Sequence, residues 1–172
     1  MMQMLEAGGI EIVTDRIRTA DESNPQGYYE LETVKELDKG THPFWLKDAR
    51  GKAVKIIAFL ISYLPETFNY KVIFMHRDTD EVLTSQAKML ALRGEPSDTD
   101  DARMRELFEG HLAGAKRLLT SRACFEVLDI SYNEILGNAS EHAGRVNRFL
   151  GAQLDVERMA AIVNPDLYRS RR

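Results

Sequence analysis

The clearest pattern of hydrophobic and polar positions lies at residues 70–86, where the chain reads YKVIFMHRDTDEVLTSQ. Its apolar, β-favouring run, Val72–Met75, is typical of a central strand that is buried on both faces. Asp78 or Thr79 is then suited to cap a helix, and apolar side chains recur at helical spacing from there on. The pattern predicts a strand, a sharp turn that carries Arg77, and a helix.

Arg77 is predicted to lie where parallel α/β sheets bind ligands. Such ligands bind beyond the carboxyl ends of the strands, and helix N-termini there favour anions. A guanidinium offers a planar fork of donors for phosphate oxygens, and Ser85, about two helical turns later, adds a hydroxyl from the same side. These residues predict a phosphate clamp; the alternative is that Arg77 only forms a surface ion pair with a nearby acid.

The rest of the chain also alternates between short apolar runs and amphipathic segments. This alternation predicts one α/β domain over residues 1–172, with three layers and a mainly parallel sheet. The expected elements are a helix before Gly8-Gly9, a short strand over residues 10–13, a short helix from Leu31 that ends before Gly40, a buried strand over Ala53–Phe59, a long helix after residues 98–101, a strand over Phe125–Tyr132, and a helix pair that starts with Glu141–Leu150, capped by Ser140, and reaches Val163.

Composition narrows the classes of function. The net charge of −4 and the lack of a broad basic run argue against nucleic-acid binding. The longest apolar run, Ile56–Ile61, is far too short to span a membrane. A single cysteine, Cys124, excludes an internal disulfide and is expected to be a small buried residue in a reducing compartment. We expect a cytoplasmic protein, and we interpret the acidic and hydroxyl residues 98–101 as a helix cap rather than a metal site.

Three further polar side chains are candidates for a site. Lys55 interrupts an apolar run, where an ammonium needs a partner or a ligand, unless it extends to solvent from the strand's exposed start. Glu30 follows two tyrosines after a turn, and a packed loop edge is the alternative there. Tyr132 ends a predicted strand, where a core tyrosine with a solvated hydroxyl is equally consistent.

The segment from Arg77 to Ser85 resembles the 3′-phosphate-binding element of the sulfotransferase family. That element has a hydrophobic strand, an Arg, an acidic residue and a Ser eight positions after the Arg; Arg77, Asp80 and Ser85 match it, with Thr79 in place of the usual Pro. The resemblance implies a P-loop-like α/β fold. It also implies that Arg77 and Ser85 bind the 3′-phosphate of 3′-phosphoadenosine 5′-phosphosulfate (PAPS), the sulfuryl donor.

The same resemblance assigns roles to four more residues. Lys55 matches the Lys of a Lys-Thr-His motif and would stabilise the bridging oxygen of PAPS, but Ile57 replaces the catalytic His. Glu30 would contact the acceptor or act as a general base. Tyr132 would pack against the adenine. Arg169 would substitute for the Arg of a late Arg-Lys-Gly segment that also binds the 3′-phosphate.

The family's first strand and its glycine-rich 5′-phosphosulfate loop have no counterpart in the sequence. The opening MMQMLEAGG resembles the segment that follows that loop in bacterial members, so we expect a domain that is truncated at its N-terminus. Two hypotheses follow. One is sulfuryl transfer from PAPS to a hydroxyl or amine of an unidentified small-molecule acceptor. The other is a non-catalytic relative that binds 3′-phosphoadenosine 5′-phosphate (PAP) or pairs with a second copy through an exposed sheet edge. A small-molecule kinase is disfavoured because no Walker-type lysine is evident.

Overall fold

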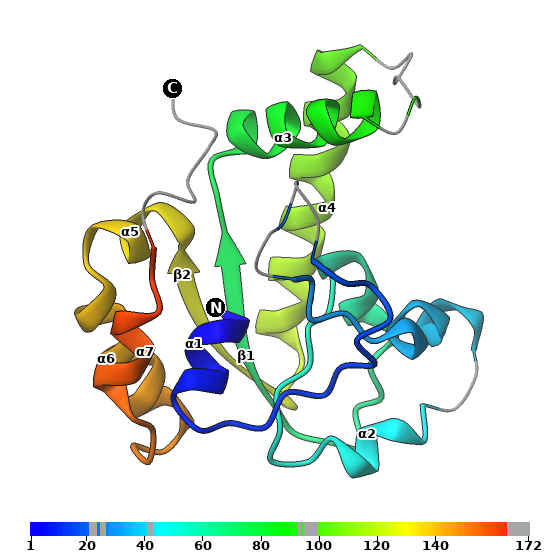
Figure 1. Ribbon diagram of the computed structural model, residues 1–172. Helices are drawn as coiled ribbons and strands as arrows, with labels where there is room; N and C mark the ends of the chain where they lie inside the picture. Colours follow the sequence, from blue (N-terminus) through cyan, green and yellow to red (C-terminus); the bar gives the residue numbers. More distant parts are fainter. Residues whose placement is uncertain (21–23, 25–26, 41–42, 93, 95–99, 165–172) are drawn as a thin grey trace.

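Two parallel strands, β1 (Tyr70–His76) and β2 (Phe125–Ser131), form the sheet of this computed structural model. The structure describes residues 1–172 except 21–23, 25–26, 41–42, 93, 95–99 and 165–172 (Figure 1). The strands pair in register from Tyr70 opposite Phe125 to His76 opposite Ser131. Their carboxyl ends therefore meet at one edge, and the predicted parallel pairing is confirmed for these two strands.

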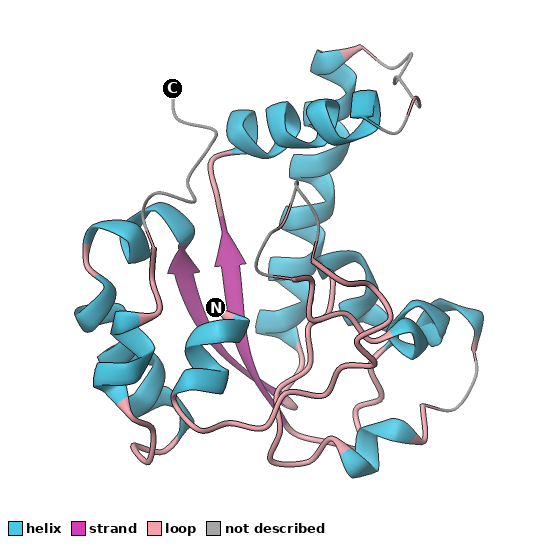
Figure 2. Ribbon diagram, in the orientation of Figure 1, coloured by secondary structure: helices cyan, strands magenta, loops and turns pink. Residues whose placement is uncertain are grey.

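Helices surround this small sheet (Figures 1 and 2). In chain order they are α1 (Met2–Ala7), the 3₁₀ helix η1 (Glu32–Lys39), α2 (Trp45–Asp48), the 3₁₀ helix η2 (Ala58–Tyr63), α3 (Thr79–Leu92), α4 (Asp101–Ser121), α5 (Tyr132–Gly137), α6 (Ala139–Leu150) and α7 (Val156–Ala161).

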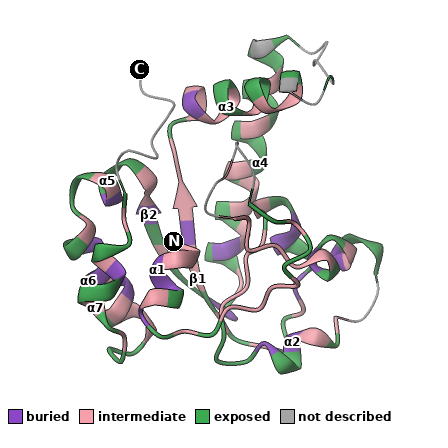
Figure 3. Cartoon of the chain, viewed as in Figure 1, coloured by how far each residue is buried: buried purple, intermediate pink, exposed green. Residues whose placement is uncertain are grey.

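The strands contribute side chains to two separate cores, because successive residues of a strand point to opposite faces. Val72, Phe74 and Phe125 pack with residues of η1, η2 and α4. Ile73 and Ile130 pack on the other face with residues of α1, α5, α6 and α7. Buried positions accordingly lie on both sides of the sheet (Figure 3). Helices therefore cover both faces, and the carboxyl edge of the sheet lies between them.

Glycine stop signals were located correctly by the sequence pattern. Helix α1 ends before Gly8-Gly9, and α6 ends before Gly151; Gly9 and Gly151 have φ values of 99° and 114°, which L-residues rarely adopt. The cap of α6 differs from the expectation. Asn138, rather than Ser140, caps the helix, and its Oδ1 accepts a hydrogen bond from the backbone N–H of Glu141 at 3.4 Å.

The predicted strand over Ala53–Phe59 is wrong. Within the described residues only Ala53 of this segment is in a β-bridge, with Ile12, and η2 begins already at Ala58. The predicted strand over residues 10–13 is limited to this same bridge. An apolar run fits a buried helical turn as well as a strand, and here the run packs into the first core as η2.

Strand β1 is also less buried than a central strand. Phe74 is its only buried side chain, and in the described part of the chain β1 pairs with β2 alone. The structure thus has a mixed α/β fold with a two-stranded parallel sheet, which is smaller than the predicted one. Cys124 is a free, buried thiol in the first core, as expected. None of the described helices is both long enough and apolar enough to cross a membrane.

Candidate functional site

Arg77 lies between β1 and α3, at the edge where the carboxyl ends of both strands meet. Asp78 caps α3, because its Oδ1 accepts the backbone N–H groups of Asp80 at 3.0 Å and Glu81 at 3.3 Å. The predicted order, in which a strand is followed by a turn that carries Arg77 and then by a capped helix, is therefore confirmed. Since Asp78 already takes these two helix N–H groups, an anion at this edge depends on side chains for its binding.

Arg77, Glu81, Tyr132 and Asn133 form a group of contacts between α3 and α5, which we term the Arg77 cluster. The Nε–H of Arg77 donates to Oε2 of Glu81 at 2.7 Å. The guanidinium carbon lies 4.9 Å from the centre of the Tyr132 ring, within the range of a cation–π interaction. The structure thus brings together two residues, Arg77 and Tyr132, that the sequence assigned to one nucleotide site.

Glu81 is the buried member of the Arg77 cluster. It is 7% exposed, and no other described side chain of α3 is buried. A buried carboxylate needs partners, and besides Arg77 it accepts a hydrogen bond at Oε1 from Nδ2 of Asn133 at 3.3 Å. The Arg77–Glu81 pair therefore fixes one side of the guanidinium from inside the protein.

Sequence reasoning missed Glu81 and matched Asp80 to the acidic position of the motif instead. Asp80 forms an ion pair with Arg105 of α4. Both acids lie in the first turn of α3, so composition alone did not separate them. The spacing of four residues from Arg77 to Glu81 was the signal that favours contact, because side chains four apart in a helix lie on one face.

Ser85 lies one helical turn after Glu81 on the same face of α3, and it is exposed. Its predicted contact with a phosphate stays a prediction. Arg169, the predicted substitute for the late basic residue of the family, lies outside the described residues.

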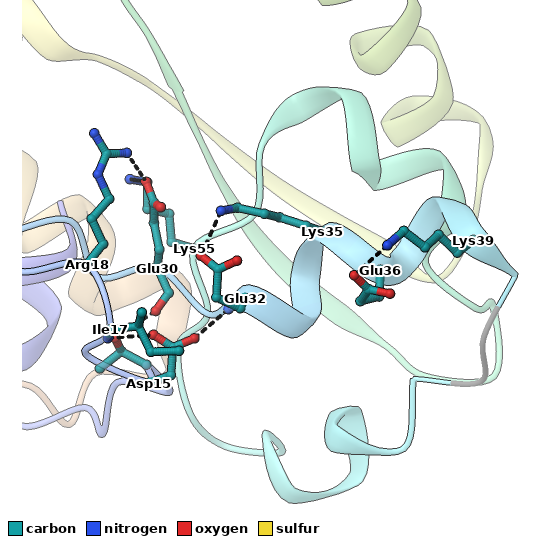
Figure 4. A network of polar contacts seen from close by, with 10 residues as sticks. Asp15, Ile17, Arg18, Glu30, Glu32, Lys35, Glu36, Lys39 and Lys55 are labelled. Atoms are coloured by element: carbon teal, nitrogen blue, oxygen red, sulfur yellow. Dashed lines mark hydrogen bonds and ion pairs between the residues drawn. The ribbon is translucent and has the colours of Figure 1, made fainter. Parts of the chain in front are cut away.

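Lys55 and Glu30 meet in a second group together with Arg18 (Figure 4). Tyr28 also contacts both cations, and we term these four residues the Glu30 cluster. The Lys55 Nζ lies 3.6 Å from Oε1 of Glu30 and donates to the backbone oxygen of Tyr28 at 2.9 Å. Arg18 Nη1 lies 3.2 Å from the same Oε1, and its guanidinium is 3.4 Å from the centre of the Tyr28 ring. These partners explain how a lysine is accommodated next to an apolar run.

Asp15 holds the loop that carries the Glu30 cluster. Its Oδ2 accepts the backbone N–H of Glu32 at 2.6 Å and its Oδ1 that of Ile17 at 2.9 Å. These two hydrogen bonds, that from Glu32 first, lower the pKa of Asp15 below its usual value of 3.8. The Thr14 hydroxyl adds a bond to the backbone oxygen of Glu30 at 2.8 Å. The position of Glu30 is thus set by its backbone as well as by its ion pairs.

Tyr29 connects this loop to α1. Its hydroxyl donates to Oε2 of Glu6 at 2.7 Å, and its φ of 52° is unusual for a residue other than glycine. Burial and then the hydrogen bond to Glu6 raise the pKa of Tyr29 to about 12. The turn before Glu30 is therefore fixed from both ends.

The contacts above link Arg77 to Tyr132 in one cluster and Lys55 to Glu30 in the other. The Arg77 cluster presents a planar cation on an aromatic ring, an arrangement suited to a phosphorylated aromatic ligand. The described residues include no group of three or more His, Cys, Asp or Glu that could hold a metal ion. Comparison with known proteins gave no match, as no family model, no curated protein and no solved structure matches the chain.

Proposed function

We propose that this chain is a sulfotransferase-like domain that binds PAPS or PAP at the Arg77 cluster and transfers sulfuryl to a hydroxyl or amine acceptor. The observation that supports this proposal most strongly is the position of Arg77. It follows β1 at the carboxyl edge of a parallel sheet, contacts Tyr132 directly after the neighbouring strand, and is held by the buried Glu81. This is the edge at which α/β folds bind nucleotides.

The contacts of Arg77 agree with a role in phosphate binding. Glu81 accepts the Nε–H of Arg77 at 2.7 Å, and a guanidinium offers a planar fork of donors that matches the oxygens of a phosphate. A guanidinium whose rotamer is fixed loses less entropy when it binds a ligand than a mobile one. Tyr132 offers an aromatic surface beside this cation, suited to the adenine of the same nucleotide.

The Glu30 cluster supplies the other residues of the proposed reaction. In this proposal Lys55 stabilises the bridging oxygen of PAPS as the sulfuryl group leaves. Glu30 is held by both Lys55 and Arg18, so its carboxylate must separate from at least one cation before it can accept a proton from an acceptor. We therefore propose that Glu30 positions Lys55 and contacts the acceptor.

One observation favours a second candidate, a non-catalytic protein that binds PAP or associates with a second copy. Ile57 stands at the position where the family resemblance places the catalytic His, and an isoleucine cannot act as the general base. This candidate retains the Arg77 cluster as a nucleotide site. It differs from the first in predicting binding without transfer.

Calorimetric titration with PAP tests the shared nucleotide site, with adenosine 5′-phosphate as the ligand that lacks the 3′-phosphate. We expect PAP to bind, and Arg77→Ala to weaken binding about 30-fold or more, since a charge-assisted contact contributes roughly 2 kcal/mol or more. Arg158→Ala is the matched control, because Arg158 is a highly exposed arginine of α7 and should not matter. Equal binding of both nucleotides, or equal affinity of both variants, would refute the site.

Transfer of labelled sulfuryl from PAPS to a panel of hydroxyl and amine acceptors then separates the two candidates. Transfer that requires Lys55 supports the enzyme. Binding of PAP without transfer to any acceptor supports the non-catalytic alternative.

A further inference from the structure

Arg18 and Lys55 converge on one carboxylate oxygen in the Glu30 cluster (Figure 4). Nη1 of Arg18 lies 3.2 Å from Oε1 of Glu30, and Nζ of Lys55 lies 3.6 Å from the same atom. The side chain of Arg18 is 32% exposed and that of Lys55 38% exposed, so solvent reaches both cations. Two positive charges thus face one negative charge at a place that a ligand can reach.

The two neighbouring acids have partners of their own. The carboxylate of Asp15 accepts two backbone N–H groups, and Oε1 of Glu32 lies 2.7 Å from Nζ of Lys35. Among the described residues, Glu30 is therefore the carboxylate that pairs with both Arg18 and Lys55.

The guanidinium of Arg18 is held on one side and keeps donors on the other. Its central carbon lies 3.4 Å from the centre of the Tyr28 ring, which is a stacking distance. Within the part of the chain that the structure describes, its hydrogen bonding is limited to the bond from Nη1 to Glu30. Nε and Nη2 thus remain to bind an oxyanion, for which a guanidinium provides a planar fork of donors.

The backbone beside these residues has an unusual conformation. Arg16, two positions before Arg18, has a φ of 56°, and Tyr29, directly before Glu30, has a φ of 52°. Residues other than glycine rarely adopt such values, which persist only where the surroundings hold them and which gather at ligand sites. The hydrogen bond from Tyr29 to Glu6 provides such support. A cluster that is fixed in advance loses less entropy when a ligand binds.

We propose that Arg18 is a specificity residue that binds an anionic group of the acceptor, a carboxylate or a sulfate, so that the acceptor is an acid rather than a neutral molecule. This inference deepens the proposed function and rests on it, because Lys55 then places the acceptor beside the transferred group. Glu30 is the internal anion that compensates Arg18 and Lys55 until the acceptor adds its own negative charge to the cluster.

A binding experiment tests the site without any transfer. The Nε–H signal of Arg18 is followed by NMR in protein whose arginine side chains carry ¹⁵N, and it is assigned by its loss in Arg18→Gln. Sodium glucuronate and glucose 6-sulfate should each shift this signal with saturation. Glucose with sodium chloride at the same ionic strength should leave it in place.

Two variants should change this binding in opposite directions, as followed by the ring signals of Tyr28. Arg18→Gln should weaken the binding of glucuronate about 10-fold or more, because a charge-assisted contact is lost. Glu30→Gln should tighten it, because the internal anion is removed. Arg158→Gln is the matched control, since Arg158 is a highly exposed arginine of α7 and should not matter.

Kinetics with paired acceptors give the second readout. In the panel of hydroxyl and amine acceptors, each acid is compared with its neutral counterpart. We expect kcat/KM to favour the acids about 10- to 100-fold, and Arg18→Gln to remove this preference through KM. Arg18→Lys, which keeps the charge but lacks the fork, should retain part of it. A purely structural role of Arg18 would change both acceptors of a pair alike.

Three results would contradict the inference. An Arg18 signal that neither acid moves, or that sodium chloride moves equally, would overturn the anion site. Equal kcat/KM for acidic and neutral acceptors would overturn the specificity while the proposed function stands. Transfer to no acceptor, with PAP binding intact, would overturn the sulfuryl transfer and with it the assignment of this anion site to an acceptor. Circular dichroism of each variant separates these results from a loss of folding.

Discussion

Replacing Glu81 with Gln tests whether a buried ion pair holds Arg77 in place. The side chain of Glu81 is 7% exposed and that of Arg77 24% exposed, so water screens this pair less than a surface pair. The carboxylate serves two donors, Arg77 Nε at Oε2 and Asn133 Nδ2 at Oε1. An amide has one acceptor oxygen, so in the variant one of these donors faces an NH₂ group instead.

The expected loss of stability follows from these contacts. A charge-assisted hydrogen bond contributes about 1.5–3 kcal/mol and a neutral one about 1 kcal/mol, and an unsatisfied buried donor costs roughly 1–3 kcal/mol. Allowing for relaxation at the partly exposed arginine, we expect Glu81→Gln to destabilise the fold by about 2 kcal/mol. With a urea m-value of roughly 2 kcal/mol/M, the unfolding midpoint should fall by about 1 M.

Urea unfolding followed by the fluorescence of Trp45, the only tryptophan, and by circular dichroism measures this loss. Glu36→Gln is the matched control, because Glu36 pairs with Lys39 on the exposed face of η1 and its replacement should cost less than about 0.5 kcal/mol. A double-mutant cycle with Arg77→Met should give a coupling energy of about 1–2 kcal/mol. If Glu81→Gln is no more destabilising than the control, or the coupling is zero, the pair does not fix Arg77.

Three further predictions concern titration and packing. In an alkaline absorbance titration Tyr29→Phe should remove one phenol with a pKa of about 12; because the folded pKa is raised, the stability linked to Tyr29 is present below pH 10 and is lost as the pH rises through 12. Asp15 has a lowered folded pKa, so its contribution is present above pH 4 and is lost as the pH falls through the folded value; Asp15→Asn should therefore destabilise the protein at pH 7 in urea unfolding, and this loss should shrink as the pH falls below 4. Met159 is 0% exposed, and Met159→Ala should cost about 2–5 kcal/mol in the same assay, whereas a loss below 1 kcal/mol would contradict the second core.

Local signals made the unit from β1 to α3 predictable. An unbroken apolar run, an Asp at the cap position and helical periodicity all point to one structure within a short segment, and the structure agrees with each. The sequence pattern did not separate Glu81 from Asp80, because the choice between them depends on Arg105 of α4, which is distant in sequence.

Nonlocal packing explains the other differences. The apolar run over Ala53–Phe59 became a single bridge and a 3₁₀ helix, since burial in the first core satisfies apolar side chains in either conformation. Lys55 and Glu30 were both candidates, but Arg18, the second cation that pairs with Glu30, was not identified, because loops that fold back on each other leave no periodic signal.

The most direct test of the nucleotide site is an NMR titration. PAP is added to protein whose arginine side chains carry ¹⁵N. The Nε–H signal of Arg77, assigned by its loss in Arg77→Lys, should shift and saturate with PAP, and adenosine 5′-phosphate at the same concentrations should leave it unchanged. The ring signals of Tyr132 should follow the same binding curve. A PAP titration that leaves both residues unperturbed, or shifts only distant arginines such as Arg158, would contradict the central claim that the Arg77 cluster binds a 3′-phosphorylated nucleotide.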